Sequence, residues 1–404
     1  MLALLCALAL RVAGAGMHRT PWVEAEDFGA KADNQTLSSE GINAALKHAS
    51  SAGGGIVHVR GRGTYRVGRI ELQSNTVLKI GPKTLLHASD NKKHWTSRTV
   101  QVPAKCGGAG LVQNATRGGV FFALRAHNFS IGGGGTVNGG GAVWNNDFEM
   151  RTHFLEFFFC SDVVVEDLTI TNSSSWTLRP SFSKRLIFRR LTILGDTTGA
   201  NHHNTDGFDP WASQDVEFRD SYYEAGESPG FRQPERNILV DNITCAYAHG
   251  LTIGSEVSGG IRNVTFSNIR VHHGQPVKMK TTCGRGAYVR DVLYENITGT
   301  DVDGGAVWIS MQYHESTGDC PKNKTTIFEN VVVRNVHVNK ATDAYTIVGL
   351  GIIAPRRRPG GSSDASIRGL VMENVTVAEY TNRGECAHAD VTAKHVSPKL
   401  PSCK

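Results

Sequence analysis

At 404 residues the chain is long for one ordinary globular core, yet no Pro/Ser-rich linker or block of charge divides it. Its 45 glycines and 8% aromatic residues favour many tight turns over long helices, and beyond the first residues no apolar run is long enough to span a bilayer. The formal net charge of +6 would attract a polyanion without identifying it. A repeat architecture would reconcile this length with the undivided composition.

The N-terminal stretch MLALLCALALRVAGAG is typical of a secretory signal peptide. An apolar run from Leu2 to Leu10 precedes the small residues of the segment 13–15, although Arg11 interrupts them. We therefore expect residues 1–15 to be a signal peptide and residues 16–404 to form a single domain of a secreted, extracellular or cell-wall protein. An acidic polysaccharide then suits the positive charge better than nucleic acid, because no nucleic-acid-binding signature accompanies the basic run at 356–358.

The segment 36–50, TLSSEGINAALKHAS, carries Ile42, Ala45 and Leu46 at helical spacing after a Ser-rich start. We expect one helix here, capping the open end of a solenoid whose exposed coil edge would otherwise pair with other chains. The Gly-rich segment 131–141, IGGGGTVNGGG, does not match G-x-G-x-x-G, so it indicates tight turns between coils and not a phosphate loop.

Strand-like runs recur from residue 163 onward, as VVVEDLTI, LIFRRLTI, VEFRDSYY, ILVDNITC, VTFSNIRV, VLYENITG, VVVRNVHV and LVMENVTV. Their spacing of roughly 22 to 39 residues is too irregular for propeller blades but suits a solenoid with loops of varying length. The repeat predicts an all-β fold, a parallel β-helix whose coils stack about 4.8 Å apart. An asparagine at the same point of several repeats predicts an internal stack of side-chain amides. These residues are Asn242, Asn268, Asn296, Asn335 and Asn374.

Nine Asn-x-Ser/Thr sequons also suit a secreted glycoprotein. A stacked asparagine cannot readily carry a glycan, so the sequons at Asn242, Asn296 and Asn374 are interpreted as by-products of the repeat. The expected glycan sites are Asn34, Asn114, Asn172 and Asn323.

Most coils carry a second short run, and polar residues concentrate there. In NTDGFDP, Asn204 and Asp206 fall on one face of an extended segment. Asp209 falls on the other face unless Gly207 bends the chain. Two nearby carboxylates are what glycosidic hydrolysis needs, although an Asp near Gly and Pro commonly marks a turn.

Two later runs add a histidine and two lysines. AHGLTIGSEVSGG supplies His249 in a glycine-bounded bend, and PVKMKT supplies Lys278 and Lys280 on one face of a strand. In order and spacing these runs resemble glycoside hydrolase family 28, the polygalacturonases. The resemblance extends from about Glu26 to the C-terminus, through DFGA, AGGGIVHV, GTYRVGRIELQSNTVL, TVNGGGAVW, NTDGFDP, AHGLTIGSEVSGG and VKMKT.

The resemblance implies a right-handed parallel β-helix of the pectin-lyase-like kind, with a cleft across successive coils. It implies cleavage of α-1,4-linked galacturonan with inversion, without metal or other cofactor. Asp206 would be a base or water-positioning carboxylate, and His249 would tune the acid. Carboxylates one coil apart can lie at the roughly 6.5 to 9.5 Å separation that leaves room for a nucleophilic water. The residues implied to contact the substrate are Asn204, Lys278, Lys280 and Tyr313.

The chain departs from the family pattern in two places. The family's Arg-Ile-Lys is here Lys278-Met279-Lys280, which keeps two positive charges but loses the planar fork that matches a carboxylate. The family's Gly-Asp-Asp, which provides the acid, appears at best as the segment 226–228, Gly-Glu-Ser. Glu227 is a candidate substitute acid and Asp209 a further candidate carboxylate, but the strand that would aim Glu227 does not follow.

The stretch SYYEAGESPGFRQPER at 221–236 passes straight into NILVDNITC, so we expect that one coil has lost a strand. A segment of about 15 to 30 residues would be missing between Gly226 and Gly230, through skipped coding sequence or a genuine deletion. Without the acid, the rate of hydrolysis should fall by about 100-fold to 10,000-fold, which is the contribution of acid catalysis alone.

His202 and His203 would point to opposite faces of a strand, so we expect no metal site. Removal of the leader leaves seven cysteines, hence one thiol without a partner in an oxidising compartment. The resemblance implies a disulfide between Cys386 and Cys403, and the missing segment would remove the family partner of Cys245.

Three functions stay open at this point. The first is a secreted polygalacturonase. The second is an exo-acting or rhamnogalacturonan-directed relative, suggested by the altered lysine pair and by GFDPWAS and NILVDNITC. The third is a catalytically inactive β-helix that binds acidic polysaccharide. In each case we expect a monomer that binds neither nucleic acid nor membrane.

Overall fold

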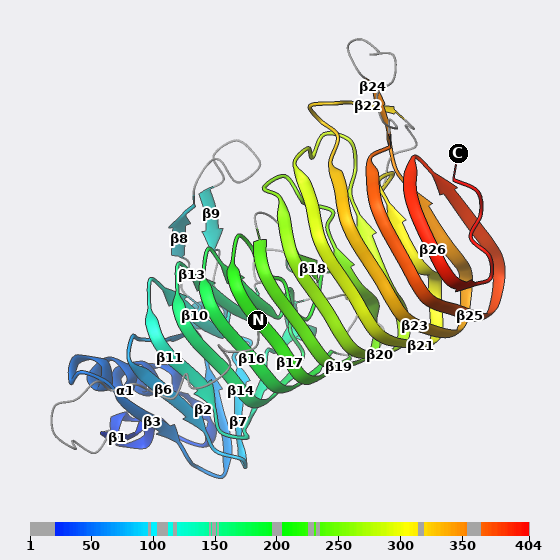
Figure 1. Ribbon diagram of the computed structural model, residues 1–404. Coiled ribbons are helices and arrows are strands. Elements are labelled where there is room, and N and C mark those ends of the chain that lie inside the picture. Colours follow the sequence, from blue (N-terminus) through cyan, green and yellow to red (C-terminus); the bar gives the residue numbers. More distant parts are fainter. Residues whose placement is uncertain are drawn as a thin grey trace, which may run out of the picture.

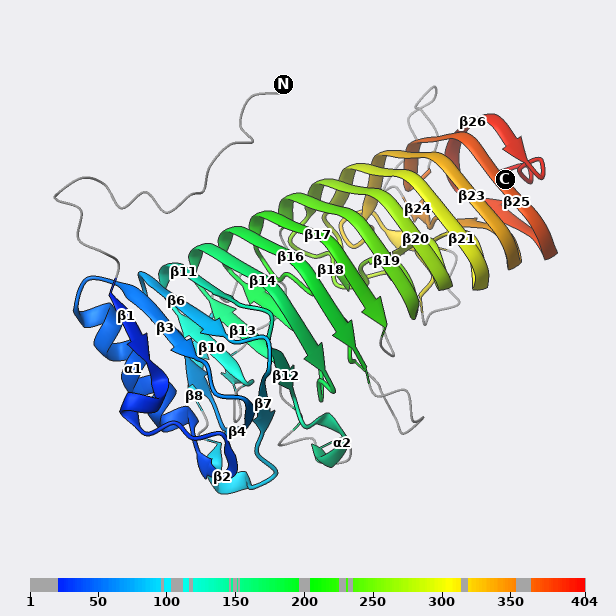
Figure 2. The same ribbon diagram turned by 90° about the horizontal axis from the view of Figure 1, so that it is seen from below.

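The protein is a right-handed parallel β-helix, as its repeats predict (Figure 1). The computed structural model describes residues 21–95, 98–102, 112–115, 119–144, 147, 151, 153–195, 204–224, 230–231, 235–313, 319–353 and 365–403. Coils follow one another in chain order from one end of the solenoid to the other (Figure 2). Residues 1–15, the expected signal peptide, lie outside the described ranges.

Helix α1 (Ser39–Ser51) covers the N-terminal end of the solenoid, as expected for a cap (Figure 1). Its apolar stripe of Ile42, Ala45 and Leu46 is fully buried. Burial of three such side chains contributes on the order of several kcal/mol and removes the first coil edge from solvent. The remaining helical elements are short: η1 (Ala25–Phe28), η2 (Lys92–His94) and α2 (Gly141–Trp144).

The first coils use a separate short strand for each face. Between β11 and β12, Gly133 and Gly134 have φ of 117° and 86°, so the Gly-rich segment forms the predicted tight turn. The strands are β1 (Trp22–Glu24), β2 (Asp33–Leu37), β3 (Gly55–Val59), β4 (Gly63–Val67), β5 (Ile70–Glu71), β6 (Thr76–Ile80), β7 (Thr84–Ala88), β10 (Phe121–Leu124), β11 (His127–Gly132), β12 (Thr136–Asn138), β13 (Leu155–Phe158) and β15 (Leu178–Ser181).

Later strands run around a corner from one face to the next. The first part of β14 pairs with β11 and its last part with β12, so one strand replaces two. Strands β14 (Ser161–Thr171), β16 (Lys184–Leu194) and β17 (Gln214–Glu224) cover two faces in this way. After a second corner the third face is added in β19 (Glu235–Ile253), β20 (Ile261–Lys280), β21 (Tyr288–Ser310), β23 (Ile327–Val348) and β25 (Ile367–Ala387). The last strand is β26 (Ala389–Ser397).

The first corner carries the predicted ladder of amides. The Asn296 Nδ2 donates to Asn268 Oδ1 at 3.2 Å, and Asn335 donates to Asn296 at 3.1 Å. Asn374 continues the series by donating to Asn335 at 2.9 Å, while Asn242 donates to a neighbouring aspartate. The stack is therefore confirmed, and the expectation that its laddered amides carry no glycan stays a prediction.

The internal placement of this ladder was wrong. Asn242, Asn268 and Asn296 are exposed and lie on the outside of the corner. Each has a φ between 52° and 56°, the left-handed region that Asn tolerates better than branched residues. This backbone bends the strand at the Asn, so the amide stays at the surface while the neighbouring apolar residues turn inward.

The second corner depends on glycine. A Cβ on Gly250, whose φ is 98°, would lie 1.8 Å from the carbonyl oxygen of Gln275 in the next coil. A Cβ on Gly384 would lie 1.6 Å from the Tyr345 carbonyl oxygen. Adjacent coils pack backbone against backbone here, so any side chain would push them apart.

Two excursions leave the solenoid on one side (Figure 1). Strands β8 (Arg98–Gln101) and β9 (Val112–Ala115) form an antiparallel hairpin, and β22 (Asp319–Pro321) pairs with β24 (Gly351–Ile353). Val100 of the hairpin packs with Phe122, Phe158 and Trp211, so the hairpin covers early coils of the third face. In the described ranges no helix has the length and apolar character needed to cross a bilayer.

Disulfides join Cys386 to Cys403, as the resemblance implied, and Cys283 to Cys320, a pair that the sequence did not predict. Cys160 and Cys245 are free thiols buried in the core. Cys106 lies outside the described residues. Cys245 is therefore without a disulfide partner, as expected, but Cys160 is also free, so the described residues hold two unpaired thiols where the sequence predicted one.

Candidate active site

The third face of the β-helix carries the second runs of the repeat. Backbone pairings of Leu178 with Phe208 and of Ser181 with Trp211 place the NTDGFDP segment beside β15. Further along, Lys278 pairs with Thr252 on one side and with Trp308 on the other. Stacking thus brings segments more than a hundred residues apart in the chain onto one face.

Asp206 and Asp209 are both buried, with exposed fractions of 7% and 1%. The Asp206 carbonyl accepts a hydrogen bond from the Thr177 amide at 2.7 Å, and the Asp209 amide donates to the Leu178 carbonyl at 2.8 Å. Phe208 between them lies in the hydrophobic core. Asp209 follows Phe208 directly, so it takes the side of the backbone opposite the core-facing ring, although it is itself buried.

Gly207 forms the bend that the sequence left open. A Cβ there would lie 2.2 Å from the Tyr223 ring, and the Tyr223 hydroxyl donates to the Thr205 carbonyl at 3.2 Å. Asn204 precedes this bend as an exposed residue with φ of 61°. Tyr223 of the next coil thus supports the backbone that positions Asp206.

The coil that follows is shorter, but it has not lost its strand altogether. Strand β18 (Gly230–Phe231) pairs Gly230 with Thr252 and Phe231 with Ile253 of β19. The expectation of a lost strand is corrected to a two-residue strand, which is too short to produce an alternating pattern. In register with Thr252 and Lys278, this coil presents Gly230, which has no side chain.

The structure describes only the backbone of the predicted catalytic residue His249, and it does not describe Glu227. The His249 backbone lies in β19, where pairing with β20 shifts register between Tyr247 and Gly250. Its side chain lies outside the described part of the chain, as does all of Glu227. Their assignments remain predictions.

The two lysines lie on one face of β20, as predicted. They alternate with Val277 and Met279, which are fully buried, whereas both lysines are partly exposed. The Lys280 Nζ lies 4.6 Å from the centre of the Tyr313 ring, so the structure brings together two of the predicted substrate contacts. The Tyr313 amide donates to the Thr281 carbonyl at 3.1 Å, which fixes the tyrosine beside the end of β20.

Sequence reasoning missed Trp308. Its ring lies 5.7 Å from the Lys278 Nζ, in the strand that pairs with the lysine strand. A signal was present in the sequence, because Trp308 alternates with the apolar residues Val307 and Ile309 and so falls on the outer side of the strand.

Sequence reasoning also missed a buried ionic cluster on the early coils. The Arg179 Nη1 lies 3.9 Å from the Glu156 Oε1, and both side chains are almost fully buried. The Arg179 guanidinium carbon lies 4.5 Å from the ring centre of Trp176 and 5.0 Å from that of Trp211. Burial raises the pKa of the Glu156 carboxyl, and the positive charges of Arg179 and Arg69 oppose that effect.

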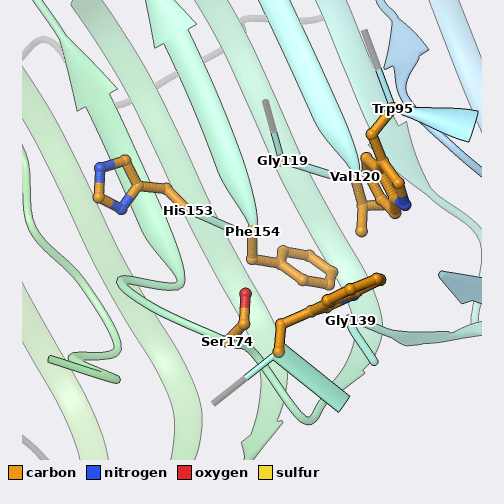
Figure 3. A pocket seen from close by; sticks show the side chains of 8 residues that line it. Trp95, Gly119, Val120, Gly139, His153, Phe154 and Ser174 are labelled. Carbon is orange, nitrogen blue, oxygen red and sulfur yellow. The ribbon is translucent and has the colours of Figure 1, made fainter. Parts of the chain in front are cut away.

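Near this cluster, a small pocket is lined by aromatic side chains (Figure 3). Trp95, Trp144 and Phe154 contribute, and His153 lies at its side, 3.8 Å from the Glu156 carboxylate. A free volume of about 10 Å³ matches a single water and is too small for a sugar.

Metal ligation has no support among the residues that the structure describes, where no three His, Cys, Asp or Glu side chains gather into a possible metal site. His202 and His203 lie outside those residues.

Comparisons with known proteins agree with this architecture. Among solved structures, a hyperthermoactive exopolygalacturonase from Thermotoga maritima superposes with a TM-score of 0.74 at 21% identity, covering 94% of this chain and 92% of that one. An endo-xylogalacturonan hydrolase from Aspergillus tubingensis gives 0.67 at 17% identity, covering 95% and 99%. At these identities the likeness shows the fold.

Sequence relatives are more informative about ancestry. A probable polygalacturonase from Vitis vinifera is 27% identical over 313 residues, which are 71% of this chain and 62% of that protein. An exopolygalacturonase from Cochliobolus carbonum is 26% identical over 311 residues, 69% and 67% of the two chains. The match thus spans less than two thirds of the grapevine protein. The model of the glycosyl hydrolases family 28 matches residues 76–355, and the chain belongs to that family.

Proposed function

We propose that this chain is a secreted, pectin-degrading glycoside hydrolase of the polygalacturonase type, acting on α-1,4-galacturonan with inversion. The observation that carries the proposal is the pairing of Lys280 with Tyr313, beside Lys278, on the face to which the NTDGFDP segment also contributes. Ammonium groups form charge-assisted contacts with a uronate carboxylate, and a tyrosine ring adds apolar contact to the sugar. The relatives named polygalacturonase support the choice of substrate.

In this mechanism the lysines hold the acidic substrate across the coils. Asp206 acts as the base that activates or positions water, with its backbone supported on Tyr223 through the Thr205 carbonyl. The group that limits this mechanism is the general acid. The coil between the NTDGFDP segment and β19 has Gly230 at the position that pairs with Thr252, which in turn pairs with Lys278. Without protonation of the leaving oxygen we expect feeble turnover.

The deciding measurement is release of reducing ends from polygalacturonate and, separately, from rhamnogalacturonan. We expect slow release from the first, abolished in Asp206→Asn. Preference for rhamnogalacturonan would move the chain to the related activity. Robust polygalacturonate turnover that disappears in Glu227→Gln would instead identify Glu227 as the acid and refute the feeble-enzyme proposal.

An exo mode of action is favoured by the β8–β9 hairpin. Val100 packs on Phe122 and Phe158, so the hairpin occupies the outer side of the early coils, where a long polymer would otherwise continue. Product analysis tests this: a single small product from the first turnover indicates exo action, and a spread of oligomer lengths contradicts it.

A catalytically inactive binder is the second candidate, and Gly230 is the observation that favours it. Binding of oligogalacturonate with no release of reducing ends, in both the parent chain and Glu227→Gln, would establish this alternative.

A further inference from the structure

We propose that Lys278 and Trp308 form a second sugar-binding position, next to that of Lys280 and Tyr313, which takes a neighbouring uronate of the same glycan. This inference rests on the proposed function and deepens it, because it assigns a specificity-determining residue that the lysine motif does not include.

The strand register puts Lys278, Lys280 and Trp308 on one surface. Lys278 of β20 pairs with Trp308 of β21, and Lys280 pairs with Ser310. The alternate positions of both strands are filled by fully buried apolar residues. Lys278, Lys280 and Trp308 therefore lie on the outer side of the third face, and all three are partly exposed. The buried residues are Val277, Met279, Val307 and Ile309.

Two pairs, each made of a lysine and an aromatic residue, lie side by side. The Lys278 Nζ is 5.7 Å from the Trp308 ring centre, and the Lys280 Nζ is 4.6 Å from the Tyr313 ring centre. The two lysines are two residues apart, hence separated by about 6.5 Å along the strand. A glycan that crosses the coils passes both pairs, so each pair can hold the carboxylate of one of two neighbouring sugars.

The Trp308 side chain packs closely against the backbone of its own strand. A Cβ on Gly305 would lie 3.2 Å from both Cβ and Cδ1 of Trp308. The lack of a side chain at Gly305 therefore lets Trp308 pack against the backbone, which reduces the entropy lost when a ligand contacts the indole.

The chemistry of this pair matches a uronate. A pyranose ring offers C–H groups on its face, which pack on an aromatic ring, and a uronate adds a carboxylate for an ammonium. The charge also changes sign along the residues that pair from coil to coil. Lys278 pairs with Trp308, Trp308 pairs with Thr346, and Thr346 pairs with Glu385. An exposed carboxylate at that end repels a polyanion, so the Trp308 position is the last of the acidic-sugar positions in this direction.

The test is binding of trigalacturonate and of its fully methyl-esterified form, measured by calorimetry on the full chain. Trp308→Ala should weaken both ligands about tenfold, because stacking does not need the charge. Lys278→Met should weaken the acidic ligand and leave the ester within about twofold. Trp22→Ala is the matched control, since Trp22 is 50% exposed in the N-terminal strand β1, far along the chain from this face.

The outcomes separate this inference from the proposed function. If the parent chain binds neither ligand, both are overturned. If it binds and Lys280→Ala weakens binding, but Trp308→Ala behaves like Trp22→Ala, only this inference is overturned. Should Trp308→Ala fail to fold, Trp308→Phe, which keeps a smaller ring, and Lys278→Met decide, with an intermediate loss expected for the first.

Discussion

Single residues on the third face combine charge with aromatic surface. Lys280 lies against Tyr313, and Lys278 lies against Trp308, so each ammonium is already next to a ring before any ligand arrives. A cation held over a ring keeps its charge available while its side chain loses some freedom in advance. This part of the third face therefore carries two positive charges beside aromatic rings, in keeping with a chain of positive net charge.

We predict that Lys280→Ala weakens binding of acidic oligosaccharides by about 1 to 3 kcal/mol, the range for a charge-assisted contact. Added salt should weaken binding to the parent chain more than to the variant. Titration of trigalacturonate at two salt concentrations measures both effects. Lys83→Ala, an exposed lysine near the capped end, is the control and should change neither; an unaltered affinity in Lys280→Ala would remove this assignment.

The sequence located Lys280 and Tyr313 because both belong to short motifs with a fixed order. It could not locate the pair of Glu156 with Arg179, since residues 23 positions apart meet only when the length of one coil is known. Burial of that charge pair depends on Trp176 and Trp211, which come from two different coils. No local sequence pattern indicates that side chains from different coils lie in contact.

At the scale of strands, the two corners are made in different ways. The first uses residues such as Asn296 in the left-handed region, linked by side-chain amides. The second uses glycines such as Gly250, where the coils approach backbone to backbone. The apolar pattern predicted where the amide ladder occurs but not that it lies outside, because a backbone bend leaves no trace in hydrophobic alternation.

Gly250→Ala should lower the free energy of unfolding by more than about 3 kcal/mol, because the new methyl group meets the Gln275 carbonyl oxygen. Gly284→Ala is a matched control: its φ is also 98°, but nothing lies within 4 Å of the added atom. That control should cost only the backbone strain, about 1 to 2 kcal/mol. Urea unfolding of both variants gives the comparison, and equal losses would contradict the close approach.

Asn296 allows the ladder to be separated from the bend. Asn296→Gly keeps access to the left-handed region and loses the amide bonds, so it should cost about 1 kcal/mol. Asn296→Ala loses both and should cost about 1 to 2 kcal/mol more. Thermal unfolding measures the order of the three proteins; if Gly and Ala were equally destabilising, the backbone argument would fail.

For the whole molecule, one continuous core runs along the solenoid and includes two free thiols. Cys160 and Cys245 are 1% and 0% exposed, and burial raises the pKa of each thiol to about 12. A thiol that is both inaccessible and protonated reacts slowly with alkylating reagents.

We predict that Cys160 and Cys245 stay unmodified in the native protein at pH 8 and are alkylated fully once the chain is unfolded in guanidinium without reductant. Peptide mass mapping identifies the labelled positions. The Cys386–Cys403 and Cys283–Cys320 peptides should stay unlabelled in both conditions, which serves as the internal control. Rapid native labelling of Cys245 would show that the core opens at the shortened coil.

The amide ladder keeps its geometry although the coils differ in length. Its hydrogen bonds join residues 22 positions apart at Asn242, 28 at Asn296, and 39 at Asn335 and Asn374. Extra residues are thus absorbed outside the corner, in loops such as the one that carries β22. The corners of the solenoid and the loops between its strands can consequently change independently. A coil of this protein could therefore accept a loop from a longer relative without a compensating change in the neighbouring coils. One such loop could bring a carboxylic acid to the position of Gly230.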